Sequence, residues 1–384
     1  MDLISQIDTL KKHETPFYAY SLRDLNYNLV SCKKAASKYN YQVHFAVKAN
    51  SNPKILHEIK NAGFGADCVS GGEVKASIQA GFAAKDVVFA GVGKADWEIE
   101  LGLKENIFCF NVESVQEIEI INELAAKYQK IAQIALRLNP NVDPKTHAYI
   151  TTGLEENKFG INPWEYDLVI EKLNQCKNVK PIGLHFHIGS QITDLNVFKE
   201  LCLRVNEIQN HFKDKNLVFS DLNLGGGLGI DYHNPDENPI PPYDEYFDLF
   251  HQFLAPMPNQ KIHFELGRAL VGYCGNLISK VLYIKEGIKT NFAILDAGMT
   301  ELIRPALYNA YHKIENISNP LGEEKVKYDV VGPICESSDT FGKSIELPKT
   351  QRGDYISIRN AGAYGEVMVS NYNLRNFPKS IFID

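Results

Sequence analysis

The stretch His44-Phe45-Ala46-Val47-Lys48-Ala49-Asn50 is apolar up to a lysine and then runs into the turn Ser51-Asn52-Pro53. A short apolar run bounded by turn residues is typical of a strand buried in a parallel sheet. In α/β barrels the chemistry lies at the carboxyl ends of such strands. Burial there lowers the pKa of a lysine toward that of a nucleophilic amine, which can hold a carbonyl cofactor as a Schiff base. Lys48 is therefore a candidate catalytic residue, although most lysines are solvated surface charges.

Strands and helices alternate along the rest of this region. Eight candidate strands cover residues 42–48, 65–70, 86–91, 107–111, 133–139, 182–189, 221–227 and 261–267. Amphipathic helical stretches such as 115–130 and 196–212 separate most of them. Eight βα repeats over about 240 residues match a barrel better than an open doubly wound sheet. We predict an α/β fold with a TIM (β/α)8 barrel.

After Gly272 the hydrophobic period changes to two, which is typical of strands. The runs are 277–284, 292–295, 328–331 and 354–358. An aromatic strand at 15–20 precedes the first barrel repeat, and Ser21 with Asp24 resembles a capping box that opens a helix through about residue 39. We predict a barrel domain over 22–272 and a β-rich domain made of 1–21 and 273–384, in which the aromatic strand pairs with the later strands.

Two long connections follow barrel strands, at 140–158 and at 231–243. Loops of this length are uncommon unless they cover a site or are disordered. We expect the first to act as a lid over the catalytic site.

The composition excludes several classes of protein. The 384 residues are 44% hydrophobic and 23% charged, as in ordinary globular proteins, and the formal net charge of −7 argues against a nucleic-acid-binding protein. The sequence has no apolar run of membrane-spanning length and no evident signal peptide. Its seven cysteines are scattered, without a C-x-x-C pair. We expect reduced thiols in a cytoplasmic protein.

Glycine-rich and charged residues follow the last two barrel strands. Gly225, Gly226 and Gly227 come after the seventh strand, where barrels commonly bind phosphate through backbone N–H groups. They are not a Rossmann fingerprint, since the third glycine is missing, and a simple tight turn is the alternative. Glu265-Leu266-Gly267-Arg268 ends the eighth strand. Together the two segments indicate a site for a phosphate and a ring.

Two further motifs have more than one interpretation. His185 and His187 lie two apart on one face of a strand, so they could bind zinc, fill the core or contact a cofactor. A third metal ligand with suitable spacing is missing from the sequence, so we expect no metal and favour cofactor contact. Cys335 lies in the β-rich part, where a lone cysteine is usually a small buried hydrophobe.

With these motifs the sequence resembles the diaminopimelate decarboxylases, a family of fold-type III enzymes that use pyridoxal 5'-phosphate (PLP). The likeness runs nearly end to end. Its motifs are Phe45 to Asn50, Val69 to Glu73, Lys158 to Ile161, His185 to Gln191, Gly225 to Gly227, Glu265 to Arg268, Arg304 to Tyr308, Gly332 to Glu336 and Ala361 to Tyr364. Leu266 departs from the family, which usually has proline there.

The resemblance implies a role for each matching residue. Lys48 would carry the cofactor, His187 would stack on its ring and Glu265 would pair with the pyridine nitrogen. The phosphate would be bound by Ser190, Gly225, Gly226, Gly227, Gly267 and Arg268. The cofactor and the lysine would be oriented by Arg137 and Asp67. The substrate or the cofactor would be contacted by Arg268, Arg304, Tyr308, Glu336 and Tyr364. Cys335 would protonate the product carbon. In this family Cys335 and Glu336 reach the site from a second subunit, which implies a homodimer with shared active sites.

The resemblance therefore predicts a carboxy-lyase that converts meso-2,6-diaminoheptanedioate to L-lysine and carbon dioxide. Alternatives are a decarboxylase for ornithine, arginine or carboxynorspermidine, an alanine-racemase-like isomerase, and a PLP carrier without turnover. Arg304 with Tyr308 favours a substrate that carries a second carboxylate, because a guanidinium binds a carboxylate in bidentate fashion. The sequence leaves Tyr364 open as a racemase base. Carriers of this kind lack the β-rich domain in which Cys335 lies.

Overall fold

The structure, a computed structural model, describes residues 3–143 and 158–383. Its contacts divide the chain into two compact units. The barrel unit comprises Leu29–Gly229 and Pro242–Gly267, and the β unit comprises Met1–Asn28, Ile230–Pro241 and Arg268–Asp384.

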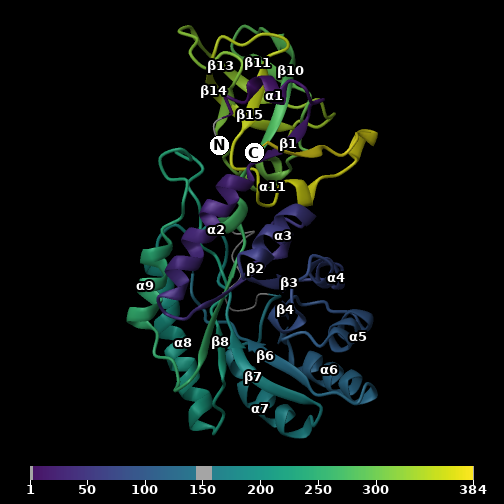
Figure 1. The fold of residues 1–384 in the computed structure, drawn as a ribbon, viewed down its shortest axis with the longest axis vertical. Coiled ribbons are helices and arrows are strands. Elements are labelled where there is room, and N and C mark those ends of the chain that lie inside the picture. Colours follow the sequence, from purple (N-terminus) through teal and green to yellow (C-terminus); the bar gives the residue numbers. More distant parts are fainter. Residues whose placement is uncertain (1–2, 144–157, 384) are drawn as a thin grey trace. The chain divides into compact units, whose positions relative to one another are not determined.

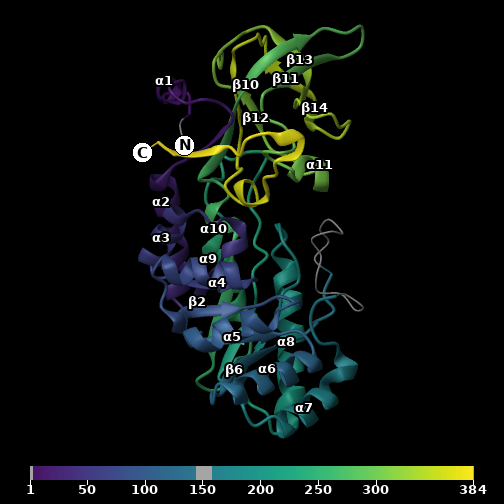
Figure 2. The same cartoon turned by 90° about the vertical axis from the view of Figure 1, so that its right-hand side faces the viewer.

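The barrel unit contains a closed barrel of parallel strands in the order β2 to β9, which confirms the predicted TIM barrel. The strands are β2 (Gln42–Ala46), β3 (Gly65–Cys68), β4 (Val87–Phe89), β5 (Cys109–Val112), β6 (Ala132–Arg137), β7 (Val179–His185), β8 (Asp221–Asn223) and β9 (Lys261–Leu266). The helices are α3 (Pro53–Asn61), α4 (Gly71–Gln79), α5 (Asp96–Glu105), α6 (Val115–Lys127), α7 (Tyr166–Gln175), α8 (Asn196–Asp214) and α9 (Tyr243–Phe253). In Figures 1 and 2, α4 to α8 lie around the outside of the strands.

Side chains at the strand ends fix where the barrel helices begin. Ser70 accepts a hydrogen bond from the backbone N–H of Glu73, and the Glu73 carboxylate accepts one from the N–H of Val69. Ser114 and Glu117 repeat the arrangement at the start of α6. These reciprocal caps satisfy N–H groups that a helix cannot satisfy itself. β3 and β5 therefore turn sharply into α4 and α6 and leave their last residues at the carboxyl end of the barrel.

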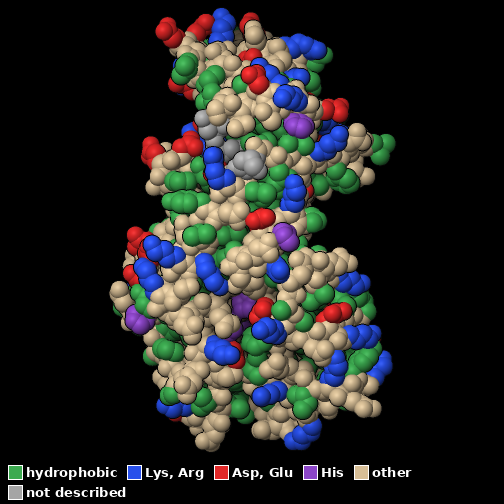
Figure 3. All heavy atoms as spheres, in the orientation of Figure 1, with side chains coloured by type: hydrophobic (Ala, Val, Ile, Leu, Met, Phe, Trp, Pro, Cys, Tyr) green, Lys and Arg blue, Asp and Glu red, His purple; other side chains and the backbone are tan. Residues whose placement is uncertain are grey.

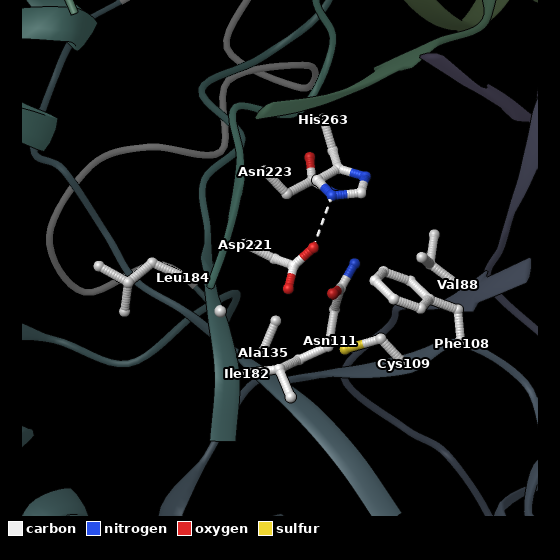
Figure 4. A pocket seen from close by; sticks show the side chains of 11 residues that line it. Val88, Phe108, Cys109, Asn111, Ala135, Ile182, Leu184, Asp221, Asn223 and His263 are labelled. Atoms are coloured by element: carbon white, nitrogen blue, oxygen red, sulfur yellow. Dashed lines mark hydrogen bonds and ion pairs between the residues drawn. The ribbon is translucent and has the colours of Figure 1, made fainter. Parts of the chain in front are cut away.

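The barrel interior is more polar than the branched apolar filling common in this fold. His263 Nε2 lies 2.9 Å from Asp221 Oδ1 (Figure 4). His263 Nδ1 lies 3.0 Å from His44 Nε2. Burial, with a contribution from His263, lowers the pKa of His44 to about 4. A pocket beside the His263–Asp221 pair is lined by the amides of Asn111 and Asn223 and by apolar side chains. Each buried ring thus has a hydrogen-bonding partner, as buried polar groups require.

The β unit is built on an eight-stranded sheet with the path β12-β15-β10-β11-β13-β14. Its strands are β1 (Phe17–Tyr20), β10 (Gly275–Lys285), β11 (Asn291–Leu295), β12 (Ile314–Asn316), β13 (Lys325–Val331), β14 (Thr340–Pro348), β15 (Tyr355–Ile358) and β16 (Lys379–Phe382). β1 pairs antiparallel with β10 and parallel with β16. The predicted pairing of the aromatic strand with the later strands is therefore confirmed.

The remaining α-helices of the described residues lie outside the barrel repeats. They are α1 (Ile7–Leu10), α2 (Leu22–Ser37), α10 (Arg268–Val271) and α11 (Arg304–Tyr308). The Ser21 hydroxyl accepts the N–H of Asp24 at 3.0 Å, as the predicted cap requires. None of the helices in the described part of the chain is long and apolar enough to span a bilayer. On the face shown in Figure 3, cationic and anionic side chains are interspersed.

The packing of the barrel strands gives a stability prediction. A Cβ at Gly65 would lie 2.5 Å from the carbonyl oxygen of Asp86, in backbone that cannot move away cheaply. We expect Gly65→Ala to destabilise the fold by roughly 1–3 kcal/mol, the range for overpacking, and to lower the unfolding midpoint by several degrees in a thermal scan. Gly93→Ala is the control, because a Cβ there has no atom within 4 Å. Equal midpoints for the two variants would contradict the close approach of β3 to this carbonyl.

Candidate active site

Lys48 lies just beyond the end of β2. The strand ends at Ala46, and Lys48 occupies the 3-10 turn Val47–Ala49, so the strand is two residues shorter than predicted. The lysine is half-buried. Its position at the carboxyl end of a barrel strand is the one from which barrel enzymes present reactive groups.

Glu265 is buried on β9 and has three fixed hydrogen-bonding partners. Asn223 Nδ2 donates to Oε1 at 2.7 Å, and Asn111 Nδ2 donates to the same oxygen at 3.0 Å. His185 Nε2 lies 2.8 Å from Oε2. Burial alone would raise the pKa of this carboxyl, but His185 above all, together with Lys48, holds the pKa well below its usual range. Glu265 is therefore an ionised carboxylate inside the barrel.

Asp67, at the end of β3, has the opposite environment. Burial, and then the negative charge of Glu265, raise the pKa of Asp67 well above its ordinary value, against a smaller lowering by Lys48. Among the described residues its Oδ1 has no hydrogen-bonding partner. Two buried carboxyls whose pKa values are pushed apart can carry different roles, one ionised and one able to hold a proton.

The glycines after β8, Gly225 to Gly227, form a cradle of closely packed backbone, in which Gly225 and Gly226 are buried. A Cβ at Gly225 would collide with the carbonyl oxygen of Phe186, and one at Gly226 with that of Glu265. The φ angles of Gly225 and Gly227 are +67° and +106°, a region that favours glycine. The N–H of Gly226 points toward His187 Nδ1 at 3.4 Å. Burial, with the cations Lys48 and Arg137, lowers the pKa of His187 well below its ordinary value, so its ring is neutral.

Arg137 is buried at the end of β6 and pairs with Glu113. Arg137 Nη1 lies 2.6 Å from Glu113 Oε1, while Glu113 Oε2 accepts the N–H of Gly160 at 3.0 Å. The guanidinium also lies 4.8 Å from the ring centroid of Phe159. The pair thus fixes the segment that follows residue 157. The predicted lid at 140–158 falls mainly on residues 144–157, outside the described residues.

In the β unit, two buried arginines share one tyrosine. Arg268 Nη1 and Arg304 Nη1 donate to the Tyr232 hydroxyl at 2.7 and 2.9 Å. Burial alone would raise the Tyr232 pKa, but the two guanidiniums lower it below its ordinary value. Arg304 Nη1 also lies 2.8 Å from His312 Nε2, and His312 Nδ1 lies 2.8 Å from the Arg359 carbonyl oxygen. Burial, then Arg304, lowers the His312 pKa to about 3, so the neutral ring accepts from Arg304.

The remaining predicted residues take these positions. Arg268 lies 4.9 Å from the ring centroid of Tyr364, which has an unusual φ of +56°. Tyr308 ends α11 and is half-buried, and Cys335 and Glu336 are exposed. The Glu336 carboxylate accepts from the Tyr372 hydroxyl at 2.8 Å. Ser190 follows β7, and Gly267 follows β9, whose last residue is the buried Leu266.

Five residues of these networks were missed from the sequence: Asn111, Asn223, Glu113, Tyr232 and His312. Asn111 is a polar residue inside an otherwise apolar strand, and that signal was available in the sequence. Tyr232 and His312 lie 80 residues apart in the numbering and meet only through the fold, so spacing gives no sign of their contact with Arg304.

Comparisons with known proteins define the class first. Residues 22–272 match the family described as pyridoxal-dependent decarboxylase, pyridoxal binding domain. A diaminopimelate decarboxylase of Bacteroides thetaiotaomicron is 57% identical over 99% of this chain and 98% of its own. A Haemophilus influenzae diaminopimelate decarboxylase is 43% identical over 96% of this chain and 88% of its own. The crystal structure of the Helicobacter pylori enzyme complexed with L-lysine matches with a TM-score of 0.92 at 38% identity, covering 98% of this chain and 94% of that one.

The chain thus belongs to the diaminopimelate decarboxylase family of pyridoxal-dependent decarboxylases. The barrel unit fits the cofactor in three respects. The three glycines after β8 carry no side chain, so their backbone can approach a phosphate closely. Glu265 retains a lone pair on Oε2 for a protonated ring nitrogen, and Asp67 Oδ1 is a buried acceptor near Lys48.

The hydrogen bonds around Glu265 predict a large effect of neutralising it. Glu265→Gln presents one acceptor oxygen and one donor to three groups that all donate, and it cannot counter a ring-nitrogen charge. We expect turnover to fall about a hundredfold or more, the scale for one lost electrostatic contact, while the absorbance of bound cofactor persists.

Glu117→Gln is the matched control, because Glu117 is also a largely buried glutamate but pairs with Lys94. Loss of turnover in the Glu117 variant equal to that in the Glu265 variant would show that neutralising any buried glutamate is sufficient, and would remove the special role of Glu265.

Proposed function

We propose that this protein removes carbon dioxide from the D-centre of meso-2,6-diaminoheptanedioate and releases L-lysine. The observation that carries the choice of substrate is the pair of buried arginines, Arg268 and Arg304, which share one neutral hydroxyl group. Two desolvated guanidiniums favour a ligand with a carboxylate that is not the one lost. The Helicobacter pylori relative is complexed with L-lysine, which carries one such carboxylate.

Each residue of the barrel unit has a separate task in this proposal. Bound PLP supplies an electron sink for the pair left by the departing carboxylate. Lys48 would hold the cofactor, and the neutral ring of His187 would lie against the cofactor ring. Glu265 holds a proton on the pyridine nitrogen, and Asp67 and Arg137 orient the groups around Lys48.

We assign phosphate binding to the cradle and to residues beside it. The backbone of Gly225 to Gly227 and of Gly267 would lie close to the phosphate, with Ser190 and Arg268 adding a hydroxyl and a charge. The N–H of Gly225 itself donates to Asn223 Oδ1. Glycine is required at Gly226 because any Cβ would meet the backbone of β9. Close approach of backbone donors to an anion is the usual reason for such a loop.

We further propose that Cys335 delivers the proton to the carbon that has lost carbon dioxide, while Glu336, Tyr308 and Tyr364 contact the substrate. Cys335 and Glu336 are exposed in the single chain, which is consistent with residues that act in the site of a second copy. The active form would then be a homodimer with shared sites. Residues 22–272 would form the cofactor-binding domain, and 1–21 with 273–384 the β-rich domain.

A cytoplasmic location accompanies this proposal. The seven cysteines, all in the described part of the chain, form no disulfide, and six of them are buried. A reducing compartment keeps such thiols from oxidation.

The test of the function is carbon dioxide release by the purified protein with PLP and a panel of amino acids. We expect meso-diaminoheptanedioate to exceed ornithine and arginine by at least about a thousandfold in kcat/KM, because substrates without the second carboxylate leave buried guanidiniums unpaired. Lys48→Ala should abolish release. A better rate with ornithine, arginine or carboxynorspermidine would replace the substrate named here, and binding of PLP without any turnover would indicate a carrier.

The arginine pair gives a separate prediction about specificity. Arg304→Ala removes a charge-assisted contact worth roughly 1.5–3 kcal/mol, so kcat/KM for the diacid should fall by about ten- to a hundredfold or more. Tyr232→Phe is the control, because it leaves both guanidiniums and removes only the hydroxyl between them. A loss in the Arg304 variant that is the same for every substrate that turns over would show that Arg304 does not read the second carboxylate.

The shared site is tested by mixing two inactive variants. Lys48→Ala and Cys335→Ala dimers, unfolded and refolded together, form mixed dimers in which one of the two sites has both residues intact. Random pairing should restore roughly a quarter of the wild-type rate, as an isologous two-fold dimer requires. Mixtures that stay as inactive as their parents, although they exchange subunits, would place Lys48 and Cys335 in the site of one chain.

A further inference from the structure

The side chain of Asn223 touches both parts of the proposed cofactor site. Its Oδ1 accepts the backbone N–H of Gly225 at 2.9 Å, and its Nδ2 donates to Glu265 Oε1 at 2.7 Å. The amide is buried, with 6% exposure. The planar amide of Asn223 therefore connects Gly225 in the glycine cradle to the carboxylate of Glu265.

Chemistry fixes the orientation of this amide. The N–H of Gly225 can only donate, and an ionised carboxylate can only accept. A flipped amide would set Nδ2 against a donor and Oδ1 against the carboxylate, which makes two repulsive contacts in place of two hydrogen bonds. The amide of Asn223 is therefore held in one orientation, with its oxygen on Gly225 and its nitrogen on Glu265.

Asn111 offers an internal comparison. It is equally buried, and it donates to the same oxygen of Glu265, at 3.0 Å. Its side chain comes from β5, on a different part of the barrel wall, and no hydrogen bond to the glycine cradle is found for it in the described residues. Both asparagines thus donate to Glu265 and support its charge, but only Asn223 also accepts the N–H of Gly225.

We infer that Asn223 is a positioning residue that sets the spacing between the phosphate cradle and the ring-nitrogen carboxylate, so that phosphate binding and ring protonation depend on one side chain. This inference rests on the proposed function, because it assumes that PLP occupies the site. Backbone contact supports the same spacing, since the N–H of Glu265 donates to the carbonyl of Gly225 at 2.7 Å. Asn223 adds a side-chain link between the two.

The test compares two probes, PLP and pyridoxal, which lacks the phosphate. Their dissociation constants for the full-length apoprotein are measured by absorbance titration, and the ratio of the two constants isolates the phosphate contribution. Asn223→Ala should lower the preference for PLP over pyridoxal by about three- to tenfold, the effect of one lost hydrogen bond on the cradle. Asn111→Ala should leave that preference within about twofold.

Aspartate variants separate the two contacts of Asn223. Asn223→Asp retains an acceptor for the Gly225 N–H but places a second negative charge against Glu265. We expect it to preserve the PLP preference and to shift the pH dependence of the bound-cofactor absorbance, as Asn111→Asp should also do.

The outcomes are distinct. An unchanged preference in a folded Asn223→Ala, or an equal loss in Asn111→Ala, overturns the positioning role. If Asn223→Ala does not fold, an Asn223→Asp variant that loses the preference overturns it instead. Failure of the wild-type protein to bind either probe would overturn the proposed function itself.

Discussion

The negative charge of Glu265, buried inside the barrel, is the constraint on which the rest of the site depends. A buried carboxylate without partners would take up a proton, because burial penalises the charged form. Three donors on three different strands, Asn111, His185 and Asn223, prevent this here. Closure of the barrel brings these strands together, so the negative charge of Glu265 depends on the complete fold.

The polar interior follows from the same need. Below Glu265 the inward positions hold His44, His263 and Asp221 in one hydrogen-bonded chain, where other barrels have branched apolar side chains. Each of these groups costs desolvation and is offset only by its partner. Asp67 is the exception, since its raised pKa shows that the barrel supports one full negative charge at this end more readily than two. In the β unit, Tyr232 has the corresponding role for positive charge, because it separates Arg268 from Arg304 and accepts from both.

Much of the barrel fold and part of the site can be predicted from the sequence, and the contacts that cannot be predicted have physical reasons for it. Strand number and order follow from apolar runs and the helices between them, and the closed barrel confirms them. Lys48 was recognisable because the apolar run stops there, although the strand itself ends at Ala46 and a 3-10 turn carries the lysine. Asn223 was not recognised, because its role depends on Glu265, which is 42 residues away and reaches it only across the barrel wall. Cys335 is likewise exposed in the single chain, so its proposed role requires a second copy of the protein.

The most direct measurement of the central claim is the protonation state of Glu265 itself. Carboxyl 13C NMR of protein labelled at the glutamate side-chain carboxyl, with the resonance assigned by its absence from Glu265→Gln, reports that state as the pH changes. We predict that the Glu265 carboxyl carbon keeps the chemical shift of a carboxylate from about pH 8 to about pH 5.5, because the pKa of Glu265 lies well below its ordinary value. A resonance that titrates within that range, or that has the shift of a protonated carboxyl at neutral pH, would contradict it.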